Sequence, residues 1–124
     1  MTIDAGSLTD VVGIRVGHYE RSNRNWNTGT TVILADQPVT AGVDVRGGGP
    51  GTRETDALSP INLVEHIDAI CLTGGSAFGL RAADGVVDEL ADRGRGFSVG
   101  TEPHQVVPVV PSAVIFDLGR GGRS

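Results

Sequence analysis

The residues that most suggest chemistry lie in the stretch CLTGGSAFGL (71–80), where an apolar run meets two glycines and a serine. A nucleophile elbow needs the pattern G-x-S-x-G, because small residues around the serine permit a strained turn from strand to helix. Here Phe78 occupies the last position of that pattern, and the glycine follows one residue later, at Gly79. The sequence therefore favours Ser76 as the N-cap of a helix rather than as a nucleophile.

A base for such a serine is not placed by the sequence, which contains the histidines His18, His66 and His104. The last two also lack a third ligand at the spacing of a zinc site. Phosphate binding is disfavoured, since there is no G-x-G-x-x-G pattern and the chain contains no lysine. Two interpretations of Gly74 and Gly75 stay open. Either their free N–H groups hold a substrate carboxylate or carbonyl, or they only turn the chain.

The second unusual stretch is VDVRGGGPGTRET (43–55), in which two arginines and a glutamate flank three consecutive glycines. Arg46, Arg53 and Glu54 could form a buried ion network or fix a substrate carboxylate. The favoured interpretation is structural: a loop locked by Arg–Glu pairing. The single cysteine, Cys71, lies in a predicted buried strand, so we expect an inert thiol that forms no internal disulfide.

The elements that must position these residues follow from hydrophobic periodicity. Runs rich in β-branched residues or with alternating polarity predict strands at 11–17, 30–35, 40–46 and 68–73. A polar, asparagine-rich loop or hairpin connection is expected between the first two strands. A long glycine-rich loop is expected at 47–60.

Two helices and a last strand complete the prediction. A short helix is expected at 60–67 with Ser59 as its N-cap, and a longer amphipathic helix runs from Ser76 to the stop at Arg93-Gly94. In 106–118, two prolines confine the regular strand to the second half. The pattern indicates an α/β protein. Because the chain ends on a turn directly after a strong strand, we expect it to be a fragment.

Composition narrows the class of protein. The 124 residues carry a formal net charge of −5, which argues against a nucleic-acid partner. No apolar run approaches the roughly 18 residues that span a bilayer, so no membrane partner is expected. The start of the chain lacks a charged and then apolar leader, which predicts no secretory signal and a cytoplasmic protein.

Five segments, taken in order, resemble the amino-terminal half of the self-processing aminopeptidases, peptidase family S58. They are TDVVGIRVGH, GTTVILA, GVDVRGGGPGTRETD, ICLTGGSAFGL with AADGV, and VPVVPSAVIFDLGRGG. The family includes L-aminopeptidase/D-Ala-esterase-amidases, β-aminopeptidases and nylon-oligomer hydrolases. The resemblance covers nearly all of the chain and is far more specific than any single motif.

The resemblance implies a four-layer αββα sandwich similar to the N-terminal-nucleophile hydrolases, with residues 1–124 as the first part of one autoprocessed domain. The precursor cuts itself before a serine or threonine, which becomes the nucleophile of a smaller β chain and whose α-amino group can act as base. No cofactor is needed. The implied partners are that C-terminal β chain, a small peptide or amide substrate, and further copies in a homo-oligomer.

The resemblance places the nucleophile and its surrounding lysine and asparagine beyond this chain. One family position falls inside it: the tyrosine that supports the oxyanion in nylon-oligomer hydrolases corresponds to Phe116, which has no hydroxyl. An oxyanion donor is worth roughly 3 kcal/mol, so we expect another donor or altered activity, with Phe116 as a pocket wall. The residues expected to bind substrate are Gly74, Gly75, Ser76, Phe116, Arg46 and Arg53.

Three functions remain to be compared. The leading one is a self-cleaving aminopeptidase or amidase that hydrolyses N-terminal amino acids from peptides, amides or esters. The second is a weak or inactive homologue that acts as a binding or structural protein, which the Phe116 departure favours. The third is a stand-alone serine esterase that uses Ser76. The choice among L-, D-, β- and ω-amino-acid substrates stays open.

Overall fold

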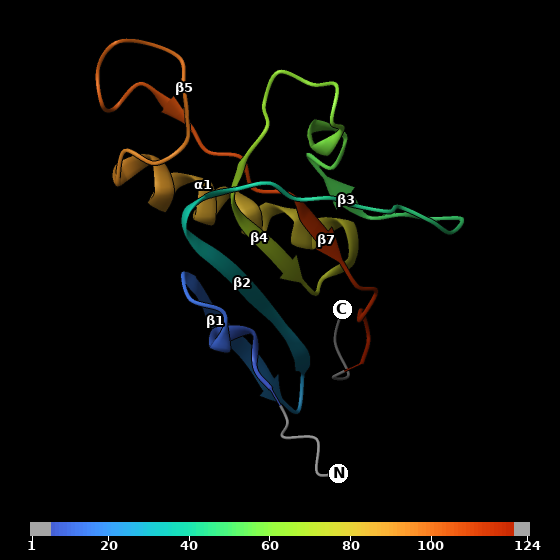
Figure 1. Cartoon of the computed structure of the whole chain (residues 1–124). Coiled ribbons are helices and arrows are strands. Elements are labelled where there is room, and N and C mark those ends of the chain that lie inside the picture. Colours follow the sequence, from blue (N-terminus) through green and yellow to red (C-terminus); the bar gives the residue numbers. More distant parts are fainter. Residues whose placement is uncertain (1–5, 121–124) are drawn as a thin grey trace, which may run out of the picture.

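The computed structural model describes residues 6–120, so the predictions for the two chain ends, 1–5 and 121–124, lie outside the described residues. Five strands form one mixed sheet in the order β1-β2-β4-β7-β3 (Figure 1). They are β1 (Ile14–Asn23), β2 (Trp26–Val39), β3 (Thr52–Arg53), β4 (Ile67–Thr73) and β7 (Ser112–Val114). Strands β4 and β7 run parallel, and the other neighbouring strands are antiparallel.

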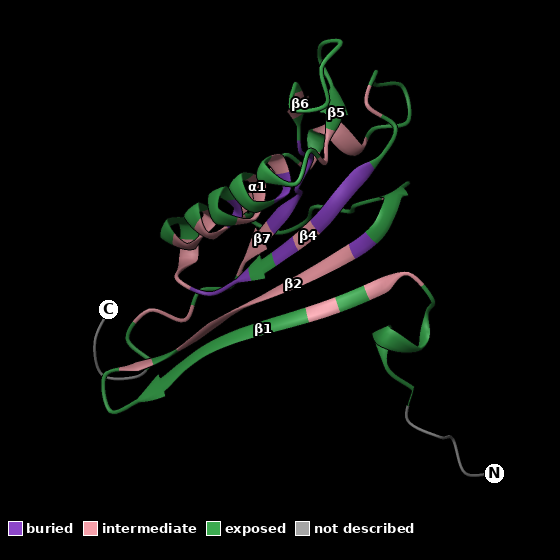
Figure 2. Ribbon diagram, turned by 90° about the vertical axis from the view of Figure 1, so that its left-hand side faces the viewer, coloured by how far each residue is buried: buried purple, intermediate pink, exposed green. Residues whose placement is uncertain are grey.

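The helix predicted from position 76 is confirmed, and it covers one face of the sheet (Figure 2). It begins as a 3₁₀ segment, η3 (Ser76–Arg81), and continues as the α-helix α1 (Ala82–Asp92). Gly94, with φ +66°, lies just beyond its end, as the predicted stop requires. The smaller elements are η1 (Leu8–Asp10), η2 (Asp56–Leu58), and a hairpin of β5 (Phe97–Ser98) with β6 (Val106–Val107).

The core lies between α1 and the centre of the sheet. Its buried members are Ala69, Cys71, Ala83, Leu90 and Val110. Strand β4 is buried along most of its length, which confirms the strand predicted from its continuous apolar run. Burial of apolar area is the main favourable term in folding, so the strand that leads into the glycine turn is well supported by its packing.

The connection expected between the first two strands is strand almost throughout. Strands β1 and β2 pair over the whole of β1, which leaves only Arg24 and Asn25 in the turn. The Asn23 side chain accepts a hydrogen bond from the Asn25 N–H at 2.9 Å, and the Arg21 guanidinium stacks 4.5 Å from the centre of the Trp26 ring. Such local contacts stabilise a strand that hydrophobic alternation does not reveal.

Two other predicted elements are wrong. Residues 40–46 form no strand, because the last pair between β2 and β4 joins Val39 to Ile67 and the chain beyond has no strand to pair with. Residues 60–67 form no helix, and the segment consists of a turn, a bend and irregular chain before β4 begins at Ile67. Its apolar residues Ile61 and Leu63 are 92% and 83% exposed, so a helix there would have no buried face to stabilise it.

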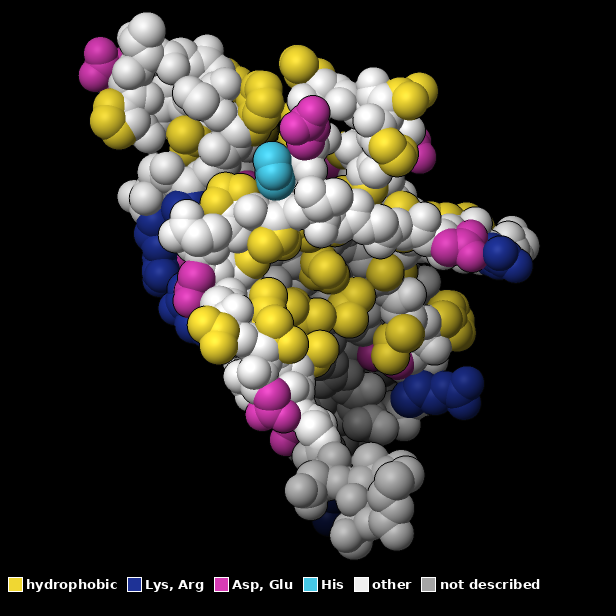
Figure 3. Space-filling model, viewed as in Figure 1, with side chains coloured by type: hydrophobic (Ala, Val, Ile, Leu, Met, Phe, Trp, Pro, Cys, Tyr) yellow, Lys and Arg dark blue, Asp and Glu magenta, His cyan; other side chains and the backbone are white. Residues whose placement is uncertain are grey.

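The second face of the sheet lies away from α1, and within residues 6–120 no α-helix covers it (Figure 2). The cross-strand pair Ile33–Ile70 and the pair Leu72–Ala113 share this face, because directly paired residues point the same way. Apolar side chains gather at the centre of the molecule in the corresponding view (Figure 3). Leu72 is 43% exposed, and an apolar sheet face of this kind normally packs against another layer.

Candidate functional site

The Gly74–Gly75–Ser76 turn leaves the end of the central strand β4 and leads directly into η3. Each of its three N–H groups already donates a hydrogen bond within the chain. Gly74 donates to the Gly29 carbonyl at 2.8 Å, Gly75 to a carboxylate oxygen of Asp117 at 2.7 Å, and Ser76 to the Ile115 carbonyl at 3.0 Å. The expectation of free N–H groups at these residues is therefore wrong.

Ser76 has a strained backbone. Its φ of +53° lies in the left-handed region, which costs a non-glycine residue about 1–3 kcal/mol and is often retained at functional sites. The N-cap of η3 is Gly75, with φ +88° and no side-chain cap, so the prediction that Ser76 caps the helix is wrong. The turn is thus strained like a nucleophile elbow, although Phe78 stands where a small residue belongs.

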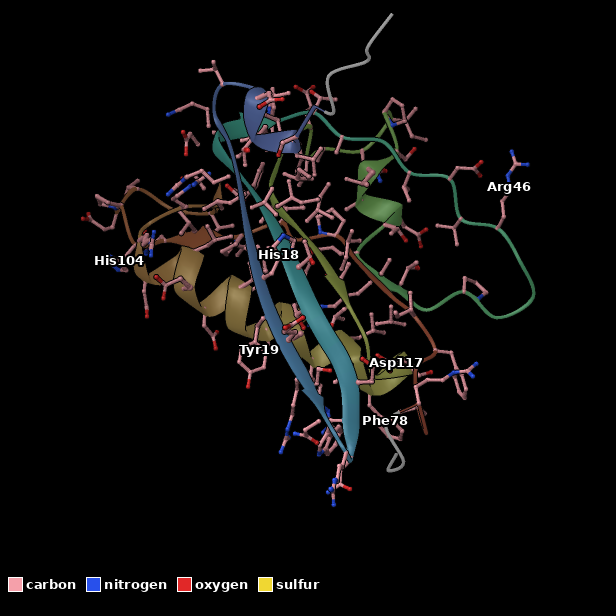
Figure 4. All side chains as sticks on the ribbon, turned by 90° about the horizontal axis from the view of Figure 1, so that it is seen from below. His18, Tyr19, Arg46, Phe78, His104 and Asp117 are labelled. Carbon is pink, nitrogen blue, oxygen red and sulfur yellow. The ribbon has the colours of Figure 1, made fainter. Side chains whose placement is uncertain are left out.

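Asp117 holds this turn from the segment that follows β7 (Figure 4). Its Oδ1 accepts the Gly75 N–H across 42 residues of sequence. Gly74 leaves room for the carboxylate, because a Cβ at position 74 would stand 2.0 Å from Oδ2 and 2.2 Å from Thr28 Oγ1. Oδ2 is enclosed and has no hydrogen-bond partner within residues 6–120. The glycine at position 74 is therefore required by packing.

The pKa of the Asp117 carboxyl lies below its ordinary value. The largest cause is the Thr28 hydroxyl, which favours the charged form. Burial opposes this effect, and the Gly75 N–H adds to it. The group is a carboxylate at neutral pH, which is a stronger acceptor for the Gly75 N–H than a neutral acid.

A hollow of about 480 Å³ opens beside the turn. Strands β1 and β2 and the segment after β7 form its walls, with His18, Thr28, Thr31, Ile115 and Asp117 among the lining residues. His18 Nδ1 lies 2.8 Å from Thr31 Oγ1, a hydrogen bond that fixes the imidazole ring. Hydroxyl, imidazole and carboxylate groups around one hollow suit a polar ligand with hydrogen-bonding ends.

Arg46 does not reach this hollow. It lies at the outer bend of the loop that follows β2, far from Asp117 (Figure 4). Its Nε lies 2.7 Å from Asp44 Oδ2, and its side chain is 85% exposed. The predicted buried network around Arg46 is therefore wrong, because its partner is a neighbouring aspartate in a loop that projects into solvent.

Arg53 has a structural contact of its own. Its Nη1 donates to the Leu80 carbonyl at 3.4 Å and pairs with Asp84, which fastens β3 to the start of α1. Glu54 does not pair with either arginine. It has φ +60°, and its Oε2 accepts the Val110 N–H at 3.1 Å. The loop is thus locked, but by Arg–Asp and Glu–backbone contacts instead of the predicted Arg–Glu pairing.

Cys71 and Phe116 differ sharply in environment. Cys71 is fully buried, as predicted, and burial raises the pKa of its thiol while the nearby Arg53 partly offsets the rise. Phe116 is 70% exposed, and although its neighbours Ile115 and Asp117 line the hollow, its own side chain does not. Its role as a pocket wall stays a prediction.

The sequence reasoning does not identify Asp117 or Thr28. The only signal for Asp117 is an acidic residue directly after an apolar run, which is common where a strand ends. Its pairing with Gly75 depends on the parallel register of β4 and β7, which joins Thr73 to Val114. No local pattern in the sequence reports such a register.

Within residues 6–120, no three His, Cys, Asp or Glu side chains are arranged to hold a metal ion. None of the helices in this part of the chain is both long and apolar enough to cross a membrane. His104 is not placed to act as a base for Ser76, since it lies on the opposite side of the molecule from Asp117, which binds the serine turn (Figure 4).

A mixed sheet that ends in a strained, carboxylate-held serine turn suits a hydrolase, and residues 6–124 match the model of a peptidase family. The chain belongs to peptidase family S58. The resemblance of its sequence motifs to that family is thereby confirmed.

Among the relatives named uncharacterized aminopeptidase are two mycobacterial proteins. One, from Mycobacterium tuberculosis (strain ATCC 25618 / H37Rv), is 52% identical over 122 residues, which are 94% of this chain and 35% of the relative. The other, from Mycobacterium leprae (strain TN), is 48% identical over 127 residues, 98% of this chain and 34% of the relative. The 6-aminohexanoate-oligomer endohydrolase of Paenarthrobacter ureafaciens is 37% identical over 111 residues, 88% of this chain and 27% of that enzyme. The chain spans about a third of the length of the first two relatives.

Proposed function

We propose that this chain is the amino-terminal part of a self-cleaving hydrolase that removes N-terminal amino acids from peptides, amides or esters. The observation that carries the proposal is the family match over residues 6–124, supported by the relatives named aminopeptidase. The nucleophile is a serine or threonine freed by cleavage of the longer precursor, and its own α-amino group serves as base. No cofactor takes part in this mechanism.

The complete protein is proposed to fold as a four-layer αββα sandwich. The support is the uncovered sheet face that carries Ile33, Ile70 and Leu72, opposite the face that α1 covers. A second sheet packed about 10 Å away would remove this apolar surface from water. That sheet would come from the part of the protein that this chain does not include, and further copies would assemble into a homo-oligomer.

Ser76 is proposed to contact the substrate with its hydroxyl, while Gly74 and Gly75 shape the wall beside it. The support is a strained serine in a turn that is bonded to Gly29, Ile115 and Asp117, three residues that line the polar hollow, although Ser76 itself is not one of its lining residues. Polar groups that meet an amide in such a hollow fix its orientation, and orientation is one of the larger contributions to catalysis. Phe116 stands at the family's tyrosine position, so the oxyanion donor must come from elsewhere.

The proposal is tested with the full-length polypeptide. Its intact mass under denaturing conditions is expected to show two chains, one of which begins with serine or threonine. Replacement of that residue by alanine is expected to leave one uncut chain that does not hydrolyse an aminoacyl p-nitroanilide. A variant that is still cut and still active would refute the proposed mechanism.

The second candidate is a homologue that has kept the fold and lost catalysis. The departure at Phe116 favours it, because this residue offers no hydroxyl for an oxyanion. The two candidates separate in one assay. Turnover of aminoacyl p-nitroanilides by the purified wild-type protein excludes the inactive homologue, and a single uncut chain without turnover supports it.

A further inference from the structure

One N–H group of the turn that carries Ser76 donates to a side chain. Of the hydrogen bonds that its three N–H groups donate, two join backbone to backbone, from Gly74 to Gly29 and from Ser76 to Ile115, and these do not depend on side-chain identity. The third runs from the Gly75 N–H to the Asp117 carboxylate at 2.7 Å. Substitution of Asp117 alone therefore changes how the turn is held without altering a residue of the turn.

The segment that carries Asp117 forms hydrogen bonds with several neighbouring residues in and before the turn. The Ile115 N–H donates to the Thr73 carbonyl at 3.0 Å, and the Ile115 carbonyl accepts the Ser76 N–H at 3.0 Å. Asp117 adds the contact at Gly75, between these two. This middle contact holds the residue with φ +88°, directly before the strained serine. Without it, the Gly75 N–H loses its acceptor, and we expect the peptide group that precedes Ser76 to be held less firmly.

The carboxylate has little freedom to turn away. Its Oδ2 is enclosed, and the missing Cβ of Gly74 provides the space that this oxygen fills. The side chain is therefore held at both oxygens, by a hydrogen bond at Oδ1 and by packing at Oδ2. A side chain that is fixed in this way also fixes the turn that donates to it. A residue that contacts the substrate needs such a fixed orientation.

We propose that Asp117 is a positioning residue of the hydrolase, which acts through Gly75 to hold the Ser76 hydroxyl in place for the substrate. The proposal rests on the proposed function, in which Ser76 contacts the substrate. Asp117 itself takes no part in bond making, and its effect is on the geometry of a neighbour 41 positions earlier in the chain.

The test compares Asp117→Leu with Asp117→Asn in the full-length polypeptide, with L-alanine p-nitroanilide as substrate. Leucine has a similar shape but no acceptor, and we expect kcat/KM to fall about tenfold to a hundredfold, the loss typical of a hydrogen bond to a charged group. Asparagine keeps an acceptor for Gly75, and we expect kcat/KM within about threefold of wild type. Asp88→Leu, on the exposed side of α1, is the matched control and should be unchanged.

A double-mutant cycle separates positioning from general destabilisation. In a Ser76→Ala background, Asp117→Leu is expected to change kcat/KM by less than about twofold, because the group it positions is already gone. A residue with a merely structural role would produce the same loss in both backgrounds. If Asp117→Leu does not fold, Asp117→Ser replaces it, since serine is too short to reach Gly75.

Each outcome is decisive. Full activity of a folded Asp117→Leu or Asp117→Ser variant, or equal losses with and without Ser76, overturns the positioning role while the proposed function stands. Loss of activity that asparagine restores and Ser76→Ala abolishes supports it. A wild-type polypeptide that hydrolyses no aminoacyl p-nitroanilide refutes the proposed function, and the positioning role falls with it.

Discussion

Oδ2 of Asp117 occupies the space in which a side chain at position 74 would begin, since a Cβ on Gly74 would stand 2.0 Å from that oxygen. Gly85, within α1, is different, because nothing lies within 4 Å of the place its Cβ would take. One glycine is required by the packing of the site. The other is a residue of low helix propensity on an exposed surface.

We expect Gly74→Ala to lower the free energy of unfolding by about 1–3 kcal/mol, because Asp117 or Thr28 must move. Gly85→Ala, the control, should raise it by up to about 1 kcal/mol. Urea unfolding of both variants measures the difference. A Gly74→Ala variant as stable as wild type would contradict the close contact between Gly74 and Asp117.

The Arg53–Asp84 pair is expected to serve stability and not substrate binding. Its side chains are 36% and 60% exposed, so solvent screens the pair, and a double-mutant cycle of Arg53→Leu with Asp84→Asn should give a coupling of about 0.2–1 kcal/mol. KM should stay within about twofold of wild type. A large rise in KM with Arg53→Leu alone would instead support the interpretation in which this arginine binds a substrate carboxylate.

The buried thiol of Cys71 should make stability depend on alkaline pH. Burial raises its pKa above the ordinary 9.0, so the folded protein retains this proton at pH values where the unfolded chain has lost it. The contribution of this group to stability is complete below about pH 9 and falls as the pH rises further. Unfolding free energies measured from pH 7 to pH 10.5 should decline less for Cys71→Ala than for wild type. Identical slopes would mean that the thiol is not protected by burial.

The Asp117 carboxylate should make the stability of the protein fall as the pH is lowered, whereas the Cys71 thiol should make it fall as the pH is raised. Its folded-state pKa lies below the ordinary 3.8, so its contribution to stability is present above about pH 3.8 and is lost as the pH falls further. Asp117→Asn removes this titration. Its thermal midpoint should change less between pH 5 and pH 3 than that of wild type, with Asp88→Asn as the control carboxylate.

The open face of the sheet gives a test of the sandwich proposal. Leu72 is 43% exposed in this chain. In the isolated chain, Leu72→Glu should leave the helix signal in circular dichroism unchanged and reduce aggregation. In the full-length protein, where a second sheet would bury it, the same change should destabilise by more than about 2 kcal/mol. Equal effects in the two contexts would argue against a covering layer.

Much of the fold follows from local patterns. The continuous apolar run of β4 and the 3.6-residue periodicity after Ser76 predict a buried strand followed by a helix, and both are present. The length of the strands in the β1–β2 hairpin is harder to predict from the sequence. Near the turn these strands lack hydrophobic alternation and are stabilised by side-chain contacts, such as that of Arg21 with Trp26. The strand at 40–46 fails for another reason: alternation predicts an extended chain but not whether a partner strand lies beside it.

The site was predictable only in part. Two glycines and a serine between strand and helix mark a special turn, and the structure gives that turn positive φ values at Gly75 and Ser76. The acceptors for its three N–H groups belong to residues 29, 115 and 117, which are far from the turn in sequence. Sequence patterns indicate where a backbone must bend, whereas the partners of its polar groups are decided by tertiary pairing.

The parallel pairing of β4 with β7 also governs when the turn can form during folding. The β1–β2 hairpin pairs two strands that follow one another in the sequence, and a hairpin can form within about 10 μs. The pairing of Cys71 with Ser112 is different, because η3, α1 and the β5–β6 hairpin lie between these two residues in the sequence. Closing so long a loop costs entropy before any contact compensates for it. We therefore expect the contact of Asp117 with Gly75 to form late, and Ser76 to adopt its strained conformation only in a nearly complete sheet.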